Sequence, residues 1–187
     1  PGYIDPARGI NRFSGNLGLT DDPMASNLES RLGIKVYLGN DANAAAYGEA
    51  VAGAAKGAES SITVTLGTGV GGGIILPGAG GFVVGEVGHM VIRIDGEACT
   101  CGHNGCWEAY ASATALIRQT RAAMKAHPES ALWELCKGDP EKVNGKTAFD
   151  GRDLGDPTAI QVVDAYIGYV SCGIANLMNI LEPEVVC

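Results

Sequence analysis

One short segment gathers several side chains that bind metals. They are His89, Cys99, Cys101 and Cys106, all within eighteen residues. One imidazole and three thiolates suit a four-coordinate structural zinc ion, whereas soft sulfur ligands disfavour Mg²⁺ and Ca²⁺. Gly102 and Gly105 let the backbone turn around the ion. The sequence therefore predicts a zinc knuckle over residues 89–106. Three reduced thiols without metal are the alternative, and His103 is a competing ligand.

Two carboxylates flank the knuckle. Glu86 precedes His89 by three residues, and Glu108 follows Cys106 by two. A zinc knuckle would bring Glu108 back toward His89, so two carboxylates and an imidazole would converge where several hydroxyl groups can bind. Taken singly, each glutamate is more often a solvated surface residue.

A third carboxylate, Asp41, follows Asn40 between a predicted strand and an Ala-rich predicted helix. Open α/β sheets bind ligands at such strand ends. Asp41 can take a proton from a hydroxyl there, while Asn40 holds neighbouring hydroxyls. The competing interpretation is that Asp41 only caps the helix, which is a frequent role of Asp.

A glycine-rich segment, Gly67–Gly73, follows the β-branched residues 61–66. It opens no helix and lacks the GK[ST] ending of a P-loop, which argues against Walker and Rossmann sites. Without Cβ atoms, Gly67 and Gly69 can still bring backbone N–H groups against a phosphate, and Thr68 adds a hydroxyl. A tight hairpin without a ligand is the alternative.

The elements that must position these residues alternate between helix and strand patterns. Expected helices cover about residues 22–32, 42–55, 109–126 and 157–181, and expected strands cover 34–38, 61–66 and 74–76. Asp21 and Asp22 are candidate caps of the first helix, Pro23 suits its first turn, and Gly33 ends it. We expect loops with brief strands over residues 1–23, a loop over 77–85 and a polar, broken region over 127–156.

Composition narrows the class of protein. Hydrophobic residues make up 46% and charged residues 18%, which excludes a disordered chain. The net charge of -8 disfavours a nucleic-acid partner. We find neither an apolar run of about 18 residues nor a signal peptide, so we expect no membrane partner and a cytoplasmic location. Of the six cysteines, the three closely spaced ones, Cys99, Cys101 and Cys106, are expected to bind metal, and a disulfide framework is not expected in a long, core-rich chain.

The order of these segments resembles the ROK family (repressors, open reading frames and kinases), and within it the glucokinases. The segments are Asn40–Glu49, Leu66–Ile74, Gly85–Met90 and Cys99–Glu108, with Ser112 following. The resemblance runs from about Pro1 to Val186 and implies an α/β, actin-like ATPase (ribonuclease H-like, hexokinase-type) fold, with two lobes around a cleft. Residues 1–57 would be the C-terminal part of the first lobe. Residues 58–187 would be the second lobe, with the glycine-rich phosphate turn, the zinc knuckle and long helices.

The resemblance also implies roles at matching positions. The catalytic base of the family is matched by Asp41, and its sugar-hydroxyl ligands are matched by Asn40, Glu86, His89 and Glu108. Its second phosphate-binding turn is matched by Gly67, Thr68 and Gly69. Its zinc ligands are matched by His89, Cys99, Cys101 and Cys106. His89 would bind zinc through one nitrogen and face the sugar with the other. The implied ligands are a hexose, ATP, Mg²⁺ and structural Zn²⁺, and the expected assembly is a homodimer or higher homo-oligomer.

Some features depart from the family pattern. An Asp-Gly-Gly-Thr type phosphate loop is absent, and the adenosine-binding glycine pair would follow Val186. The loop between Gly73 and Glu86 is short, and residues 16–19 read Asn-Leu-Gly-Leu where the family often has Asn-Leu-Pro-Gly-Trp. We therefore expect an internal fragment of a kinase that converts glucose to glucose 6-phosphate in glycolysis. A sugar-sensing repressor, a kinase for fructose, allose or an N-acyl hexosamine, and a non-catalytic sugar-binding module stay open.

Overall fold

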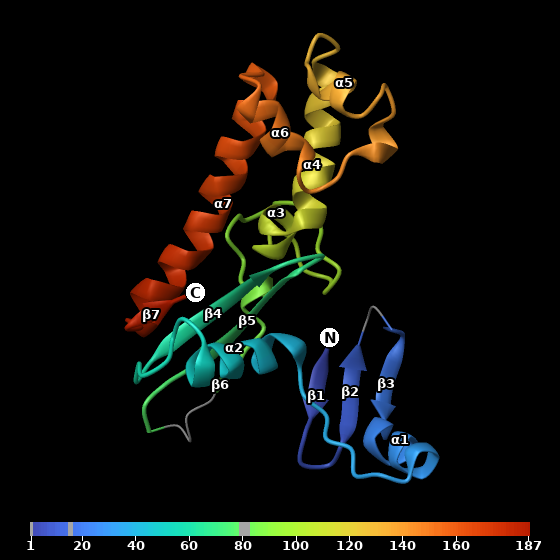
Figure 1. Ribbon diagram of the computed structural model, residues 1–187, viewed down its shortest axis with the longest axis vertical. Coiled ribbons are helices and arrows are strands. Elements are labelled where there is room, and N and C mark those ends of the chain that lie inside the picture. The colour runs from blue at the N-terminus through green and yellow to red at the C-terminus, as the bar shows by residue number, and fades with distance from the viewer. Residues whose placement is uncertain (1, 15–16, 79–82) are drawn as a thin grey trace. The chain divides into compact units, whose positions relative to one another are not determined.

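The structure is a computed structural model that describes residues 2–14, 17–78 and 83–187 (Figure 1). It divides into two compact units. Unit 1 comprises Pro1–Val64, Gly72–Gly85 and Pro183–Cys187, and unit 2 comprises Thr65–Gly71 and Glu86–Glu182. The lobe boundary proposed between residues 57 and 58 concerns the complete protein and remains a proposal.

Unit 1 begins with a small antiparallel sheet in the order β1-β2-β3, which confirms the brief strands expected there. The strands are β1 (Tyr3–Asp5), β2 (Ile10–Ser14) and β3 (Leu19–Asp22), and helix α1 (Met24–Leu32) follows. The Ala25 N–H donates to the Gly9 carbonyl at 3.0 Å. A Cβ on Gly9 would meet the Ala25 side chain, and Gly9 has φ +66°, so only glycine lets α1 approach this turn without strain.

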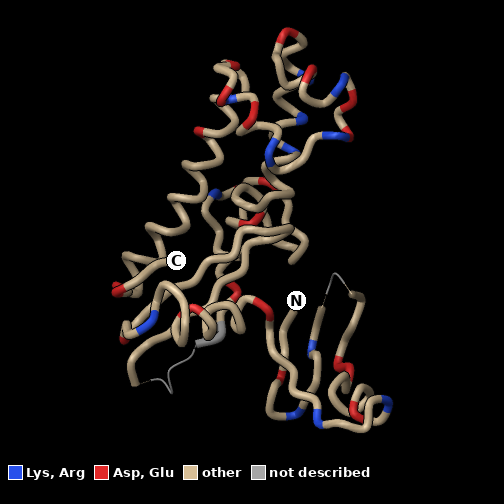
Figure 2. The backbone as a smooth tube through the Cα atoms, in the orientation of Figure 1, with Lys and Arg blue, Asp and Glu red and all other residues tan. Residues whose placement is uncertain are grey.

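Helix α1 starts and ends by different means. Pro23 is its N-cap residue and makes no side-chain cap, so the expected capping by Asp21 or Asp22 is wrong. Asp21 instead accepts from Arg12 at 2.8 Å, in a part of the chain where acidic and basic positions are interspersed (Figure 2). Gly33 ends the helix with φ 67°, as predicted.

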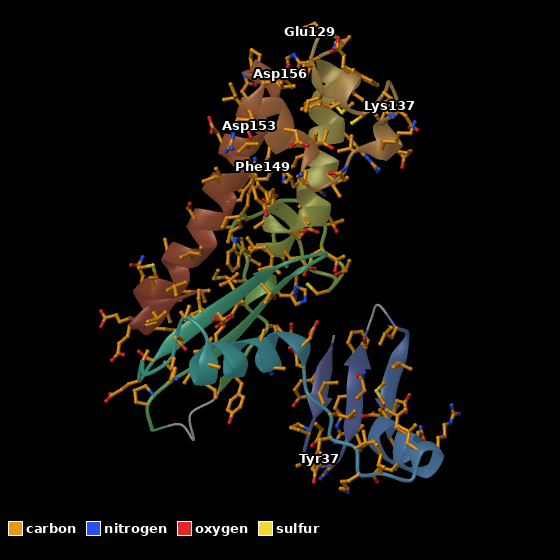
Figure 3. All side chains as sticks on the ribbon, viewed as in Figure 1. Tyr37, Glu129, Lys137, Phe149, Asp153 and Asp156 are labelled. Atoms are coloured by element: carbon orange, nitrogen blue, oxygen red, sulfur yellow. The ribbon has the colours of Figure 1, made fainter. Side chains whose placement is uncertain are left out.

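The strand expected over residues 34–38 is also wrong, because this segment has no regular secondary structure. Ile34 is 64% exposed and Tyr37 is 83% exposed, and Tyr37 lies at the outer edge of its unit in Figure 3. β-branched and aromatic residues favour a strand only where a neighbouring strand completes the backbone hydrogen bonds, and this segment has no such neighbour among the described residues.

The second sheet has the order β6-β5-β4-β7. Its strands are β4 (Ser61–Leu66), β5 (Val70–Ile75), β6 (Val83–Val84) and β7 (Val185–Val186). The prediction for residues 61–66 is confirmed with the same bounds, and the strand predicted at 74–76 starts earlier, at Val70. The segment 77–85 contains β6, and its residues 79–82 lie outside the described residues, as do 15 and 16.

Helix α2 (Asp41–Ala52) packs on this sheet, and it ends a few residues before the expected end at residue 55. A Cβ on Gly73 of β5 would overlap Ala46 of α2. Small residues on both elements therefore allow the helix to lie close to the strand.

Unit 2 is mainly helical. Its elements are η2 (Val87–His89), α3 (Glu108–Ala111), α4 (Ala113–Ala126), α5 (Leu132–Leu135), η3 (Pro140–Lys142), α6 (Thr147–Asp153) and α7 (Pro157–Leu181). The helix predicted over 109–126 is interrupted at Ser112, which is extended (φ -78°, ψ 161°) and whose side chain accepts from the Ala115 N–H to cap α4. Helix α7 has the predicted bounds.

Two apolar clusters hold these helices together. One contains Leu116, Ala148, Val162, Val163 and Tyr166, and the other contains Met124, Leu132, Cys136, Val143 and Ala159. In the part of the chain described, α7 alone is long and apolar enough to span a membrane, with a mean hydropathy of 1.2 over 18 residues and 33% of that window buried. The expectation that no such segment exists is therefore wrong, because its apolar residues are spread along the helix rather than run together. Buried core helices can have the same length and composition, so these two properties do not identify α7 as a membrane span.

Candidate functional site

The structure brings the four predicted metal ligands together. The donor atoms of His89, Cys99, Cys101 and Cys106 all lie within 4.8 Å of one another. Cys99 Sγ is 3.6 Å from His89 Nδ1, and Cys101 Sγ is 3.6 Å from Cys106 Sγ. A tetrahedral zinc ion with Zn–S of ~2.3 Å and Zn–N of ~2.0 Å holds its ligand atoms about 3.5–3.8 Å apart. The donor set therefore fits zinc in both chemistry and spacing.

The thiols of the cluster differ in how readily they ionise. Burial disfavours the Cys101 thiolate, but hydrogen bonds from the His103 backbone and from neighbouring side chains outweigh burial and lower the pKa of Cys101 to about 6. Burial, followed by the neighbouring Cys101 and Cys99, raises the pKa of Cys106 to about 12. Adjacent thiols thus compete for one negative charge. A bound metal removes this competition, because each ligand must then be a thiolate.

Backbone geometry explains the shape of the knuckle. Gly102 and Gly105 have φ +91° and +78°, as predicted for the residues that turn the chain. The Cys99 N–H donates to the His103 carbonyl at 2.8 Å, and an isolated bridge joins Val91 to Cys106. These backbone contacts close the turn that carries Cys101.

His103 contacts the cluster without belonging to it. Its Nδ1 lies 3.5 Å from Cys101 Sγ on the exposed side, while His89 completes the set of four close donor atoms. The preference for His89 over the competing His103 therefore agrees with the geometry.

A buried tryptophan that sequence reasoning did not select anchors the knuckle to α7. Trp107 is completely buried, and its Nε1 donates to the Tyr169 carbonyl at 2.8 Å. A Cβ on Gly173 would overlap the Trp107 ring, so glycine is required where the indole meets α7. Trp107 lies between Cys106 and Glu108, and its burial fixes the direction of both neighbours. The apolar Trp within a polar segment was the available signal.

Glu108 and Glu86 have different surroundings. Glu108 opens α3, its Oε1 lies 4.0 Å from Cys99 Sγ, and its Oε2 accepts from the Val70 N–H at 2.9 Å. Glu86 is exposed just before η2, and its carboxylate has no hydrogen-bonding partner among the described residues. The structure therefore brings Glu108 to the knuckle as expected, and it leaves the Glu86 carboxylate open to solvent.

The glycine-rich turn is held by its neighbours. The Gly67 N–H donates to the Gly69 carbonyl at 2.9 Å, and the Gly67 carbonyl accepts from the Ala113 N–H at 2.8 Å. Thr114 Oγ1 donates to the Thr68 carbonyl at 2.8 Å. The turn lies beside α3 and the start of α4 (Figure 1). Gly67 and Thr68 remain exposed, so an anionic group can approach them.

In unit 1, Asn40 rather than Asp41 caps helix α2. The Asn40 side chain accepts from the Asn43 N–H at 3.2 Å, and its Nδ2 donates to the Gly2 carbonyl at 3.2 Å. The alternative interpretation of Asp41 as the cap is therefore wrong. Asp41 is the first residue of α2 and is exposed. The free N–H groups of a helix N-terminus stabilise a carboxylate placed there.

Comparison with known proteins gives the family. The whole chain, residues 1–187, matches the ROK family. The chain belongs to the ROK family. It is 40% identical to a glucokinase of Thermotoga maritima, over 100% of this chain and 60% of that protein. It is 34% identical to the xylose repressor of Bacillus subtilis, over 100% of this chain and 45% of that protein.

A solved structure gives the fold class of this ROK chain. A ROK family glucokinase from Streptomyces griseus, in complex with glucose and AMPPNP, matches with a TM-score of 0.88 and 38% identity, covering 99% of this chain and 61% of that one. The predicted α/β, actin-like ATPase fold is therefore confirmed. The chain spans about 60% of the length of the glucokinases it matches.

Proposed function

We propose that the protein containing this chain transfers the γ-phosphoryl group of ATP to a hexose, with glucose as the substrate and glucose 6-phosphate as the product. The observation that carries this proposal is the match, at a TM-score of 0.88, to a glucokinase in complex with glucose and AMPPNP. The alternative hexoses fructose, allose and N-acyl hexosamines share the same chemistry and differ in the hydroxyl groups to be bound.

Asp41 is the proposed catalytic base. Its carboxylate would accept the proton of the attacking hydroxyl while that oxygen forms a bond to the γ-phosphorus. The bond between the γ-phosphorus and the bridging oxygen to the β-phosphorus breaks, and ADP leaves with that oxygen. Asp41 is exposed at the N-terminus of α2, and this position supports the role because the N-terminal N–H groups of a helix favour the carboxylate form that a base needs.

The remaining residues would bind and orient the substrates. Asn40, Glu86, His89 and Glu108 are the proposed hexose ligands, and the turn Gly67–Gly69 is the proposed contact for the phosphates. His89 presents Nδ1 to Cys99, which leaves Nε2 for a hydroxyl group. Such positioning provides much of the rate enhancement in phosphoryl transfer, since little covalent chemistry falls to the protein.

Two metals complete the proposal. His89, Cys99, Cys101 and Cys106 would hold a structural zinc ion that fixes the segment between Glu86 and Glu108. Mg²⁺, bound with ATP, would neutralise charge on the phosphates. Of the acidic side chains of this chain, we propose that Asp41 would lie nearest to the Mg²⁺ ion.

The test is product identification with the complete protein. ATP and Mg²⁺ are supplied with glucose, fructose, allose or N-acetylmannosamine in separate reactions, ADP release is followed, and the sugar phosphate is identified by NMR. We expect glucose to give the highest kcat/KM and glucose 6-phosphate as product. Absence of ADP release with all four sugars would reject the kinase.

A sugar-responsive repressor is the second candidate, supported by 34% identity to a xylose repressor over the whole chain. The composition supports the kinase instead, because 21 acidic residues outnumber 13 basic ones, and both kinds are interspersed in the chain (Figure 2). Sugar-dependent binding of the complete protein to DNA of its own promoter, without ADP release, would establish the repressor. We further propose a cytoplasmic homo-oligomer that acts in glycolysis; gel filtration with light scattering tests the assembly.

A further inference from the structure

Val70 lies where two predicted hexose ligands meet the glycine-rich turn. Its N–H donates to Glu108 Oε2 at 2.9 Å. Its carbonyl lies so close to Gly88 that a Cβ there would overlap it, and Gly88 immediately precedes His89. The Val70 N–H is therefore bonded to Glu108, and the Val70 carbonyl packs closely against the residue that precedes His89. Val70 itself is buried and directly follows Gly69.

The space around Gly69 shows how closely the Glu108 carboxylate lies against the turn. A Cβ built on Gly69 would overlap Glu108 Oε2 and lie 3.0 Å from Glu108 Cδ. A Cβ on Gly67, in the same turn, would meet nothing within 4 Å. Neither glycine has a positive φ. A side chain at position 69 would therefore have to displace the Glu108 carboxylate, with no conflict from backbone conformation, whereas position 67 has room for a side chain.

We propose that Glu108 is a positioning residue for the phosphate turn as well as a hexose ligand, and that it couples hexose binding to the conformation of that turn. The coupling rests on the proposed kinase function. A carboxylate has four acceptor sites, so Glu108 can accept from Val70 and from a sugar hydroxyl at once. A hexose that fixes the carboxylate thereby orders the Val70 N–H, and an ordered turn in return favours hexose binding, since coupling between two sites is reciprocal.

Helices α3 and α4 hold different parts of the turn, so the proposed coupling to the hexose can act only through Glu108 of α3. Ala113 and Thr114 hold the carbonyls of Gly67 and Thr68 from the start of α4. These two contacts come from outside the knuckle and hold the first half of the turn. Among the contacts described, only the hydrogen bond from the Val70 N–H to the Glu108 carboxylate joins a predicted sugar ligand to the second half of the turn, at Gly69 and Val70.

The experiment compares Gly69→Ala with Gly67→Ala in the complete, zinc-loaded protein. The new methyl group at 69 displaces the Glu108 carboxylate while leaving its charge in place, and the methyl group at 67 does not. Glucose Kd is measured by calorimetry, and amide hydrogen exchange is measured for residues 66–71. We expect Gly69→Ala to raise the glucose Kd and to speed exchange of the Val70 amide, each by about tenfold, the usual effect of one lost hydrogen bond. In Gly67→Ala both values should match the wild type.

A second pair of variants covers the case in which Gly69→Ala does not fold. Glu108→Gln keeps an oxygen that can accept from Val70, whereas Glu108→Ala does not. Exchange at Val70 should stay near the wild-type rate in the Gln variant and rise about tenfold in the Ala variant. Glucose should slow this exchange in the wild type and have no effect on it in the Ala variant.

The outcomes separate the two proposals. Wild-type exchange at Val70 in both Gly69→Ala and Glu108→Ala would overturn the positioning role, whatever the activity. If exchange at Val70 is faster in both variants but glucose does not change it in the wild type, the positioning role stands and the coupling to hexose binding is overturned. If the wild type shows neither glucose binding nor ADP release, the proposed function fails on its own, and the exchange rates in the variants still decide whether Glu108 holds the turn.

Discussion

The start of α2 and the knuckle of residues 89–106, which carries the proposed zinc ligands, hold their candidate site residues in different ways. Asn40 and Asp41 depend on one helix N-terminus, where the cap is made by a side chain three residues from its partner. The knuckle depends on distant contacts: Trp107 is buried against α7, and four donor atoms gather within 4.8 Å. Mutations at the first region should therefore change the chemistry, and their effect on the free energy of unfolding should not exceed that of one helix cap, about 1 kcal/mol. Mutations at the second should change metal content and ligand affinity together.

The largest expected effect is on turnover, from Asp41→Asn. The amide cannot accept the hydroxyl proton, so we expect kcat to fall by ~10²–10⁴-fold. The free energy of unfolding should fall by no more than ~1 kcal/mol, because the neutral amide loses the favourable interaction of the carboxylate with the N-terminus of α2. Steady-state kinetics and urea unfolding measure the two. Asp164→Asn, an exposed acidic residue on α7, is the matched control and should leave kcat unchanged. Near-normal turnover in Asp41→Asn would leave Asp41 without a catalytic role.

The next largest effect is expected from Cys101→Ala. Three remaining ligands bind zinc less tightly, so zinc affinity should fall by at least ~10²-fold, and glucose affinity should fall with it because the segment bearing His89 loosens. Zinc is measured by elemental analysis after dialysis against a chelator, and glucose Kd by calorimetry. Cys172→Ala is the control, since Cys172 is exposed on α7 outside the cluster. If protein freed of zinc keeps its full glucose affinity, metal content and ligand affinity are independent in the knuckle, and the proposed difference from the start of α2 is wrong.

Asp156 lies in unit 2 outside the knuckle and is not a proposed ligand of any substrate or metal. A mutation of Asp156 therefore tests stability alone. Its carboxylate accepts from the Ala159 N–H, the Ala131 N–H and the Ser130 hydroxyl. We expect Asp156→Ala to lower the free energy of unfolding by ~1–3 kcal/mol, because buried donors lose their acceptor. The exposed neighbour Asp153, also labelled in Figure 3, provides the control, and Asp153→Ala should cost less than ~0.5 kcal/mol.

The contribution of Asp156 should depend on pH. Burial opposes ionisation of Asp156, but the hydrogen bonds from Ala159, Ala131 and Ser130 outweigh it and lower its pKa. A lowered pKa in the folded state means that the stabilisation is complete above the unfolded-state pKa of about 3.9 and is lost as pH falls below it. The difference in unfolding free energy between wild type and Asp156→Ala should therefore be constant from about pH 5 to about pH 7 and shrink below about pH 4. A difference that grows in acid would contradict the assignment.

The smallest effect is expected at Asn40, where capping and ligand binding can be separated. Asn40→Ala should lower the free energy of unfolding by about 1 kcal/mol, and Asn40→Ser, which keeps a capping oxygen, should restore most of it. Both variants should bind glucose more weakly, because both lose the side-chain amide. Thermal unfolding and calorimetry measure the two properties. Equal stability losses in the Ser and Ala variants would show that the cap does not stabilise α2.

Several parts of this molecule follow from local sequence. Strand β4 and helix α7 have the predicted bounds, and Gly33 ends α1 in the left-handed conformation. The four proposed zinc ligands were recognisable because donor type and short spacing leave few alternatives. These features depend on side-chain periodicity, on caps, or on turns of a few residues, all of which can be read along the chain.

Other parts were decided only by tertiary structure. Residues 34–38 have strand-forming side chains but no strand to pair with, and the helix predicted over 109–126 is interrupted where Ser112 caps α4. Trp107 against Gly173 and Glu108 on Val70 join residues that lie 66 and 38 positions apart. Spacing in the sequence carries no information about such distances in space, because they depend on how strands and helices pack. Residue types therefore indicated which chemistry to expect, and packing determined that Glu108 meets the glycine-rich turn.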